Sequence, residues 1–159
     1  MKHSWCDLNK YEVAVQQRLN SSKDVIVLAE MYDDKTHKTY KRAKGVCENI
    51  CGRLYLPSTL KENDEVESVL DVLGLHGNVW LRMTYNDTVG TWYDPDNQED
   101  LTFLNFDYSD TILDCTDNFK CGFHGEGTKE HHAVIDNDGK WWSRSGNNKY
   151  SEYVLCERT

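Results

Sequence analysis

The sequence predicts a single α+β domain in which two helices pack on small antiparallel sheets and a long loop follows. Three features support this fold class: two windows with helical spacing of apolar residues, short strand-like runs around them, and a long polar stretch near the C-terminal end. The chain has 159 residues, about the length of one domain. Its five Trp and 11% aromatic residues indicate a packed core rather than a disordered chain.

Residues 1–24 are expected to form an N-terminal helical segment that packs on the domain or leads into it. Apolar residues recur there at helical spacing, at Leu8, Tyr11, Val15 and Leu19. The polar run Asn20-Ser21-Ser22 ends the pattern. A stalk or dimer helix is the alternative, but so short a helix is unstable alone in water. We therefore expect it to pack on the domain formed by residues 25–159.

Two helices are predicted within that domain. The first follows Thr39 and ends at Cys51-Gly52, because glycine is favoured just past a helix end. Its buried face is expected to hold Tyr40, Ala43, Cys47 and Ile50. The second spans residues 63–73, with Ser58 and Thr59 as candidate caps. Its buried side is expected to hold Val66, Val69, Leu70 and Leu73.

The strands are predicted from short runs rich in β-branched and aromatic residues. These runs are residues 25–31, 54–57, 79–83, 101–106, 132–135 and 150–156. Asp94-Pro95-Asp96-Asn97 is expected to form a turn. Residues 106–132 are long, polar and aperiodic, and a loop of this length in a compact domain is usually functional or needs a covalent staple.

The charge balance excludes two classes of partner. The chain carries 18 Lys+Arg against 27 Asp+Glu, a net charge of -9. Nucleic acid and anionic lipid surfaces both need a basic face, so neither is an expected partner. No apolar run approaches the roughly 20 residues that a transmembrane helix needs, so membrane insertion is not expected either.

The six cysteines indicate an oxidising compartment. They are Cys6, Cys47, Cys51, Cys115, Cys121 and Cys156. Zinc binding is the alternative, but the spacing of Cys115 and Cys121 does not suit a zinc ribbon. Two sequons, at Asn20 and Asn86, are glycosylation candidates. We expect a secreted protein or the extracellular portion of a membrane protein, although the first residues carry no signal-peptide pattern.

Several short motifs follow one another in order between Val25 and Glu157. They are Thr39-Tyr40-Lys41-Arg42-Ala43 before Cys47, Gly52-Arg53-Leu54, Ser58 with Glu62-Asn63, Trp80-Leu81-Arg82-Met83, Gly90-Thr91-Trp92, Leu101-Thr102-Phe103-Leu104-Asn105-Phe106, Gly139-Lys140-Trp141 and Tyr153-Val154-Leu155-Cys156-Glu157. This series resembles the C-type lectin-like domain, and the chain looks like a divergent member of that superfamily. Trp80-Leu81-Arg82-Met83, for example, stands where the family has Trp-Ile-Gly-Leu.

The resemblance implies a disulfide between Cys47 and Cys156. The family's second disulfide is expected to be missing, because Glu130-His131-His132 stands where the family has Glu-Asp-Cys. Cys115 and Cys121 are expected to staple the long loop locally instead. Cys6 and Cys51 remain, and they either tie the N-terminal segment to the first helix or leave Cys6 to bridge a homodimer.

Sugar-binding members of the family hold Ca²⁺ with carboxylate and amide oxygens, which suits a hard cation. Here Trp141-Trp142-Ser143 replaces the family's Trp-Asn-Asp, and only Glu130 matches a family ligand. The usual calcium site is therefore expected to be lost, and no cofactor is expected. The alternative is calcium with rearranged ligands in the long loop, where acidic residues gather at Asp107, Asp110, Asp114 and Asp117.

A zinc-dependent enzyme is a more distant alternative. His124, His131 and His132, with Glu130 or Asp136, could supply zinc ligands. Neighbouring residues on a strand point to opposite faces, so His131 and His132 are not expected to share one ion. No metalloprotease or nucleophile-elbow motif is present, so we do not expect an enzyme. His132 stands where the family has a buried Cys, so we expect it to be a core histidine.

Trp142 is the most promising ligand-binding residue. Strand alternation places it opposite Trp141, which aligns with a core residue of the family; Trp80 and Trp92 are also expected in the core. An exposed Trp beside polar residues suits recognition, and these neighbours are Ser143, Arg144, Asn147 and Asn148. The predicted function is an extracellular cell-recognition module that binds a protein or glycan without the usual calcium site.

Overall fold

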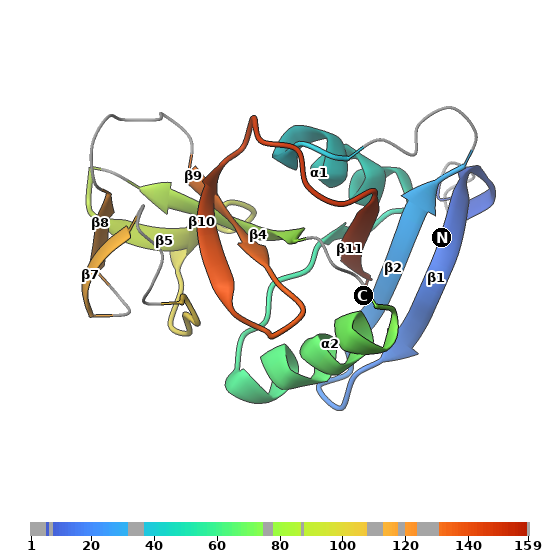
Figure 1. The fold of residues 1–159 in the computed structure, drawn as a ribbon, viewed down its shortest axis with the longest axis horizontal. Helices are drawn as coiled ribbons and strands as arrows, with labels where there is room; N and C mark the ends of the chain where they lie inside the picture. Colours follow the sequence, from blue (N-terminus) through green and yellow to red (C-terminus); the bar gives the residue numbers. More distant parts are fainter. Residues whose placement is uncertain are drawn as a thin grey trace.

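The computed structural model describes residues 6, 8–31, 37–74, 78–86, 88–107, 113–117, 120–123 and 131–158. Residues 113–117, 120–123 and 131 are described by their backbone alone. Two helices and antiparallel sheets make up this part of the chain (Figure 1), which confirms the predicted α+β class. Among the described residues, no helix is both long and apolar enough to cross a bilayer.

The first sheet brings both ends of the described chain together. Its order is β1-β2-β11-β3, with every pair antiparallel. The strands are β1 (Tyr11–Arg18), β2 (Asp24–Glu30), β3 (Arg53–Leu54) and β11 (Tyr153–Arg158). β2 is buried along almost its full length, because apolar side chains pack on both faces of this strand.

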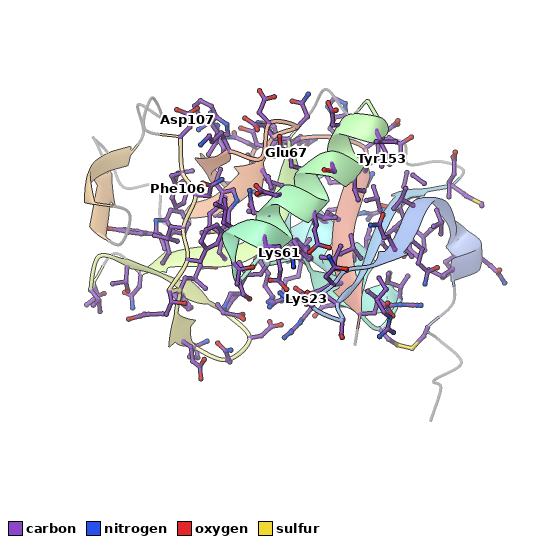
Figure 2. The ribbon with its side chains drawn as sticks, turned by 90° about the horizontal axis from the view of Figure 1, so that it is seen from below. Lys23, Lys61, Glu67, Phe106, Asp107 and Tyr153 are labelled. Atoms are coloured by element: carbon purple, nitrogen blue, oxygen red, sulfur yellow. A yellow bond between two sulfur atoms is a disulfide. The ribbon has the colours of Figure 1, made fainter. Side chains whose placement is uncertain are left out.

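The two helices cover opposite faces of this sheet. Residues of α1 (Tyr40–Asn49) share a core with Ile26 and Leu28, whereas residues of α2 (Leu60–Val72) share another with Val25 and Val27. Figures 1 and 2 show α1 and α2 separated by the strands. Both predicted helices are therefore confirmed, although α2 begins three residues earlier than expected.

Threonine side chains begin both helices. Thr39 Oγ1 accepts a hydrogen bond from the Arg42 backbone N–H at 3.3 Å, and Thr59 Oγ1 accepts one from the Glu62 N–H at 3.1 Å. Each satisfies a backbone donor that has no partner within the helix. Thr59 is thus the cap of α2 that the sequence indicated.

The second sheet has the order β10-β9-β4-β5-β6. Its strands are β4 (Val79–Asn86), β5 (Thr91–Asp94), β6 (Glu99–Asp100), β9 (His131–Ile135) and β10 (Trp141–Ser145). Trp80, Trp92 and Trp141 are each at most 2% exposed, which confirms their expected place in the core.

The expected N-terminal helix is wrong. Leu8–Lys10 form a single 3-10 turn, and residues 11–18 form strand β1, which pairs along β2 with a bulge between Val13 and Val15. The apolar residues also fit this strand, because the bulge turns Tyr11 and Val15 to opposite faces, where each packs on a different core cluster. The division at residue 24 therefore separates two strands that pair with each other.

The expected strand over residues 101–106 is also wrong. This segment makes isolated backbone contacts instead: the Leu101 N–H donates to the Trp92 carbonyl, and the Trp141 N–H donates to the Asn105 carbonyl. Leu104 and Phe106 are buried by their side chains without a hydrogen-bond ladder. Conversely, β5 was not among the predicted strands, and β10 entered only through the expected alternation of Trp141 and Trp142.

The long polar stretch contains a two-stranded hairpin, β7 (Leu113–Asp117) and β8 (Lys120–Phe123). The backbone register places Cys115 directly opposite Cys121. Their side chains lie outside the described part of the structure, so the local staple stays a prediction.

Two disulfides are described. Cys47–Cys156 joins α1 to β11, as the family resemblance implied. Cys6–Cys51 ties the N-terminal segment to the end of α1, which decides between the two alternatives for Cys6 and removes that residue from a bridge between chains.

Candidate recognition site

Trp142 lies on the face of the second sheet opposite Trp141, where it packs against the core cluster that α1 shares with Trp80 and Val134. β10 pairs with β9 so that Trp141 lies opposite Ile135 and Trp142 opposite Val134. Alternation sends Trp141 into the core, where its indole N–H donates to Asn63 Oδ1 at 2.8 Å. The next side chain, Trp142, points to the other face and is half-buried.

The Trp142 ring is held from two directions. Its indole N–H donates to Asp136 Oδ2 at 2.7 Å, and the Arg144 guanidinium carbon lies 5.3 Å from the ring centroid. The other oxygen of Asp136 accepts the backbone N–H groups of Asp138 and Lys140. A cation within about 6 Å of an indole is attracted to the ring face, so these contacts fix the orientation of Trp142.

The four predicted neighbours of Trp142 occupy three different environments. Arg144 packs beside it, and its guanidinium also donates to the Ser143 carbonyl at 2.6 Å. Asn147 and Asn148 are exposed in the turn after β10. Ser143, by contrast, is completely buried, because alternation places it on the core side with Trp141. The prediction that the Ser143 side chain contacts a ligand at the surface is therefore wrong.

The described residues at the family's calcium position do not fit a calcium ion. Trp142 places an indole there, and the Ser143 side chain faces the core. Within the described residues, no three His, Cys, Asp or Glu side chains come together as a metal site. Ca²⁺ needs six to eight oxygen ligands, and Trp142 and Ser143 direct no side-chain oxygen to this position; Glu130 lies outside the described residues.

The alternative acidic cluster falls largely outside the described residues. Asp107 is half-buried, and its backbone N–H donates to the Trp141 carbonyl. Asp110 and Glu130 lie outside the described part of the chain, as do the side chains of Asp114 and Asp117. Calcium bound by this loop therefore stays a hypothesis.

His132 is a core histidine, as predicted. It is 5% exposed, and its ring stacks on the Tyr40 ring with 3.5 Å between centroids. Its Nδ1 lies 3.2 Å from the Met83 carbonyl and 3.3 Å from Thr84 Oγ1. Burial also raises the pKa of Tyr40 to about 12. The other candidate zinc ligands of this group, His124 and the His131 side chain, lie outside the described residues.

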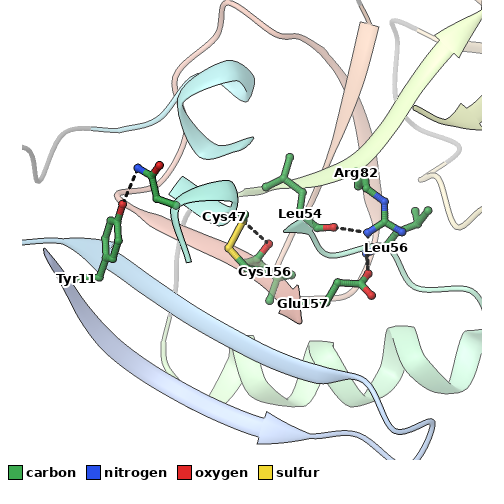
Figure 3. The surroundings of a disulfide bond; sticks show 9 residues. Tyr11, Cys47, Leu54, Leu56, Arg82, Cys156 and Glu157 are labelled. Carbon is green, nitrogen blue, oxygen red and sulfur yellow. Dashed lines mark hydrogen bonds and ion pairs between the residues drawn. A yellow bond between two sulfur atoms is a disulfide. The ribbon is translucent and has the colours of Figure 1, made fainter. Parts of the chain in front are cut away.

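Sequence reasoning did not anticipate a buried ionic network around Arg82. Its guanidinium forms two hydrogen bonds with Asp94, at 3.1 and 3.2 Å, and donates to Glu157 at 3.0 Å and to the Leu54 carbonyl at 2.7 Å. Figure 3 shows Arg82 reaching toward Leu54 and Glu157 beside the Cys47–Cys156 disulfide. Burial opposes its charge, but these partners outweigh it and raise the pKa of Arg82. The sequence carried one sign of this network: Arg82 stands where the family motif Trp-Ile-Gly-Leu has its glycine.

The two sequon asparagines differ in accessibility. Asn20 is exposed in the turn between β1 and β2, whereas Asn86 is half-buried at the end of β4, where its side-chain oxygen accepts the Thr88 N–H. Both remain glycosylation candidates.

Comparison with known proteins identifies the same family over most of the chain. Residues 36–158 match the family model described as the lectin C-type domain. A search of curated proteins by sequence finds no match.

Three solved structures share the fold at low sequence identity. The mouse scavenger receptor C-type lectin carbohydrate-recognition domain has 12% identity and a TM-score of 0.59, with 90% of this chain and 94% of that chain covered. The cow CD23 C-type carbohydrate-recognition domain, studied with a GlcNAc2Man3 oligosaccharide, has 17% identity and a TM-score of 0.59, with 94% and 93% covered. Human lithostathine has 14% identity and a TM-score of 0.61, with 89% and 95% covered.

Proposed function

This chain belongs to the lectin C-type domain family, and on that premise we propose that it is an extracellular recognition module that binds a protein or glycan without calcium at the usual site. Domains of this family are ligand-binding modules and are generally not enzymes. They are typically extracellular and disulfide-bonded, and the disulfides Cys6–Cys51 and Cys47–Cys156 agree with secretion.

The orientation of Trp142 carries this proposal. An indole that is half-buried, hydrogen-bonded to Asp136 and packed against Arg144 loses little conformational freedom when a ligand binds. Rigid aromatic anchors with adaptable polar neighbours are typical of recognition surfaces. Asn147 and Asn148 supply such exposed polar groups in the following turn. We define the recognition surface as Trp142, Arg144, Asn147 and Asn148.

Calcium does not contribute to binding in this proposal. Two fold relatives are carbohydrate-recognition domains, one studied with an oligosaccharide, which supports glycan as one of the two ligand classes. Shared fold does not transfer a ligand, so the proposal depends on the local chemistry of the recognition surface. There, an indole face and amide groups can contact sugar rings or peptide without a metal.

The test is binding of the multimerised domain to an array that carries both glycans and extracellular protein ectodomains, with EDTA present throughout. We expect selective binding that Trp142→Ala abolishes, while the melting temperature of this variant stays within a few degrees of wild type. Tyr93→Ala is the matched control, because Tyr93 is a half-buried aromatic residue on β5 rather than β10.

Two results would contradict the proposal. Binding that appears only after calcium is added would favour rearranged ligands in the long loop. Binding that Trp142→Ala and Tyr93→Ala leave equally strong would remove the recognition surface from the site, whatever its metal dependence.

A further inference from the structure

A second site is suggested by an open groove between α1 and the edge of the first sheet. Its volume is about 440 Å³, and its lining includes Tyr11 of β1, Glu30 of β2 and residues of α1. None of its lining residues comes from β10, so the groove is separate from the recognition surface. Figure 3 shows Tyr11 at this flank of α1, where its hydroxyl accepts a hydrogen bond from Asn49.

The groove is positively charged in an acidic protein. Glu30 accepts two hydrogen bonds from Arg42, at 2.9 and 2.7 Å, and lies 3.6 Å from Lys38 Nζ. One carboxylate thus faces two cations. Lys41 adds a third positive charge at the rim; it is exposed and has no ion pair within the described residues. The local charge is therefore opposite in sign to the net charge of -9.

Gly45 opens the middle of the groove wall. It lies within α1, where glycine is the least favourable residue after proline. Its φ is not positive, and a Cβ added there would meet no atom within 4 Å. Neither backbone conformation nor crowding in this chain requires glycine at position 45. The visible consequence is that the groove stays open beside Lys41 and Asn49.

We propose that this groove binds an acidic peptide segment of a protein partner. Carboxylate side chains complement Lys41 and the Arg42–Glu30–Lys38 group, and the Asn49 amide offers a donor and an acceptor that suit peptide bonds. A sugar is less well served, because the Tyr11 ring is only 5% exposed and provides no open aromatic face for stacking. The observations therefore favour peptide over glycan.

The experiment measures fluorescence anisotropy of labelled hexaglutamate with the disulfide-bonded protein at physiological salt. At that salt, charges are screened beyond about 8 Å, so the local groove rather than the net charge governs binding. We expect saturable binding of hexaglutamate and none of hexalysine. Lys41→Glu should weaken it about fivefold or more.

Lys61→Glu is the matched control. Lys41 and Lys61 are each the second residue of a helix, both are exposed, and each substitution changes the net charge equally. A glutamate in the first turn is compatible with a helix, so both variants should fold. Figure 2 shows Lys61 on α2, which packs on the other face of the sheet from α1.

Gly45→Gln provides the second variant. It adds a helix-favouring side chain in open space, so its melting temperature should equal or exceed that of wild type while hexaglutamate binding falls. The proposal is overturned if hexaglutamate does not bind, if Lys41→Glu and Lys61→Glu weaken binding equally, or if Gly45→Gln binds like wild type. Trp142→Ala should leave hexaglutamate binding unchanged, which separates failure here from failure of the recognition surface.

Discussion

Arg82 carries a charge that is costly to bury and is kept by its partners. Its side chain is 6% exposed, and those of Asp94 and Glu157 are 7% and 1% exposed. One guanidinium therefore connects β4 to β5, to β11 and, through the Leu54 carbonyl, to β3. An arginine suits this place because its planar group can donate several hydrogen bonds at fixed angles.

Replacing Arg82 with methionine should destabilise the protein by about 3–5 kcal/mol, because two buried carboxylates lose their cation. Urea denaturation with the disulfides intact measures the free energy of unfolding. The control is Arg18→Met, which breaks the exposed pair with Asp24 and should cost less than about 1 kcal/mol. Equal losses in the two variants would show that the buried network does not contribute as described.

Glu62 should make the free energy of unfolding depend on pH. Burial opposes its ionisation, but hydrogen bonds from the Ser21 side chain, the Ser58 N–H and Lys23 outweigh it and lower the pKa below 4.5. Because this pKa is lower in the folded state, the ionised carboxylate stabilises the fold. That stabilisation is fully present above the unfolded-state pKa and is lost as the pH falls through the folded-state pKa. Figure 2 shows Lys23 beside the beginning of α2, close to Lys61.

The corresponding test compares wild type with Glu62→Gln by urea denaturation across a pH series. The difference in unfolding free energy should be constant above about pH 5.5, one unit above 4.5. It should shrink as pH falls below 4.5. A difference that stays constant into strong acid would mean that the Glu62 carboxylate is not preferentially stabilised in the folded state.

The two described disulfides hold α1 between the last strand and the N-terminal segment. Cys47–Cys156 spans 109 residues and Cys6–Cys51 spans 45. In the chain-entropy model, longer loops give larger stabilisation, about 5 and about 4 kcal/mol for these lengths. The Cys47 and Cys156 side chains are also completely buried, so their bond additionally belongs to the core.

Replacing both Cys47 and Cys156 with alanine should therefore cost more stability than replacing both Cys6 and Cys51. Thermal melting of the two double variants, each with the other disulfide intact, gives the order directly. The reverse order would indicate that anchoring the N-terminal segment matters more than closing the longer loop.

The family resemblance makes calcium the natural test of the stability of the whole molecule. An ion that binds the native state raises the melting temperature by an amount that grows with the logarithm of its concentration relative to its Kd. Because Trp142 and Ser143 direct no side-chain oxygen to the usual position, we expect the same melting temperature in excess Ca²⁺ as in EDTA. A rise of several degrees would show that calcium binds the native state, would favour the rearranged ligands of the acidic long loop, and would contradict a metal-independent module.

The sequence alone was sufficient for features with a local cause. Helices α1 and α2 follow from apolar periodicity and threonine caps, which act within a few residues along the chain. The core positions of Trp80, Trp92 and Trp141 were expected from the family motifs, and the same resemblance implied the Cys47–Cys156 bond. The replacement of the family's amide and carboxylate side chains by Trp142 and Ser143 was likewise visible in the residues themselves.

Only the tertiary structure decided which distant segments pair. The periodicity of residues 8–19 fits a helix and a bulged strand alike, and pairing with β2 selects the strand. Likewise, Ser143 is buried and Trp142 is held because β10 docks on β9 in one register, which places Asp136 within reach of the indole. Hydrogen-bond ladders join residues far apart in the chain, so no local pattern records their partners. The sequence therefore determined the family and the helices, and packing determined the surfaces that remain open for binding.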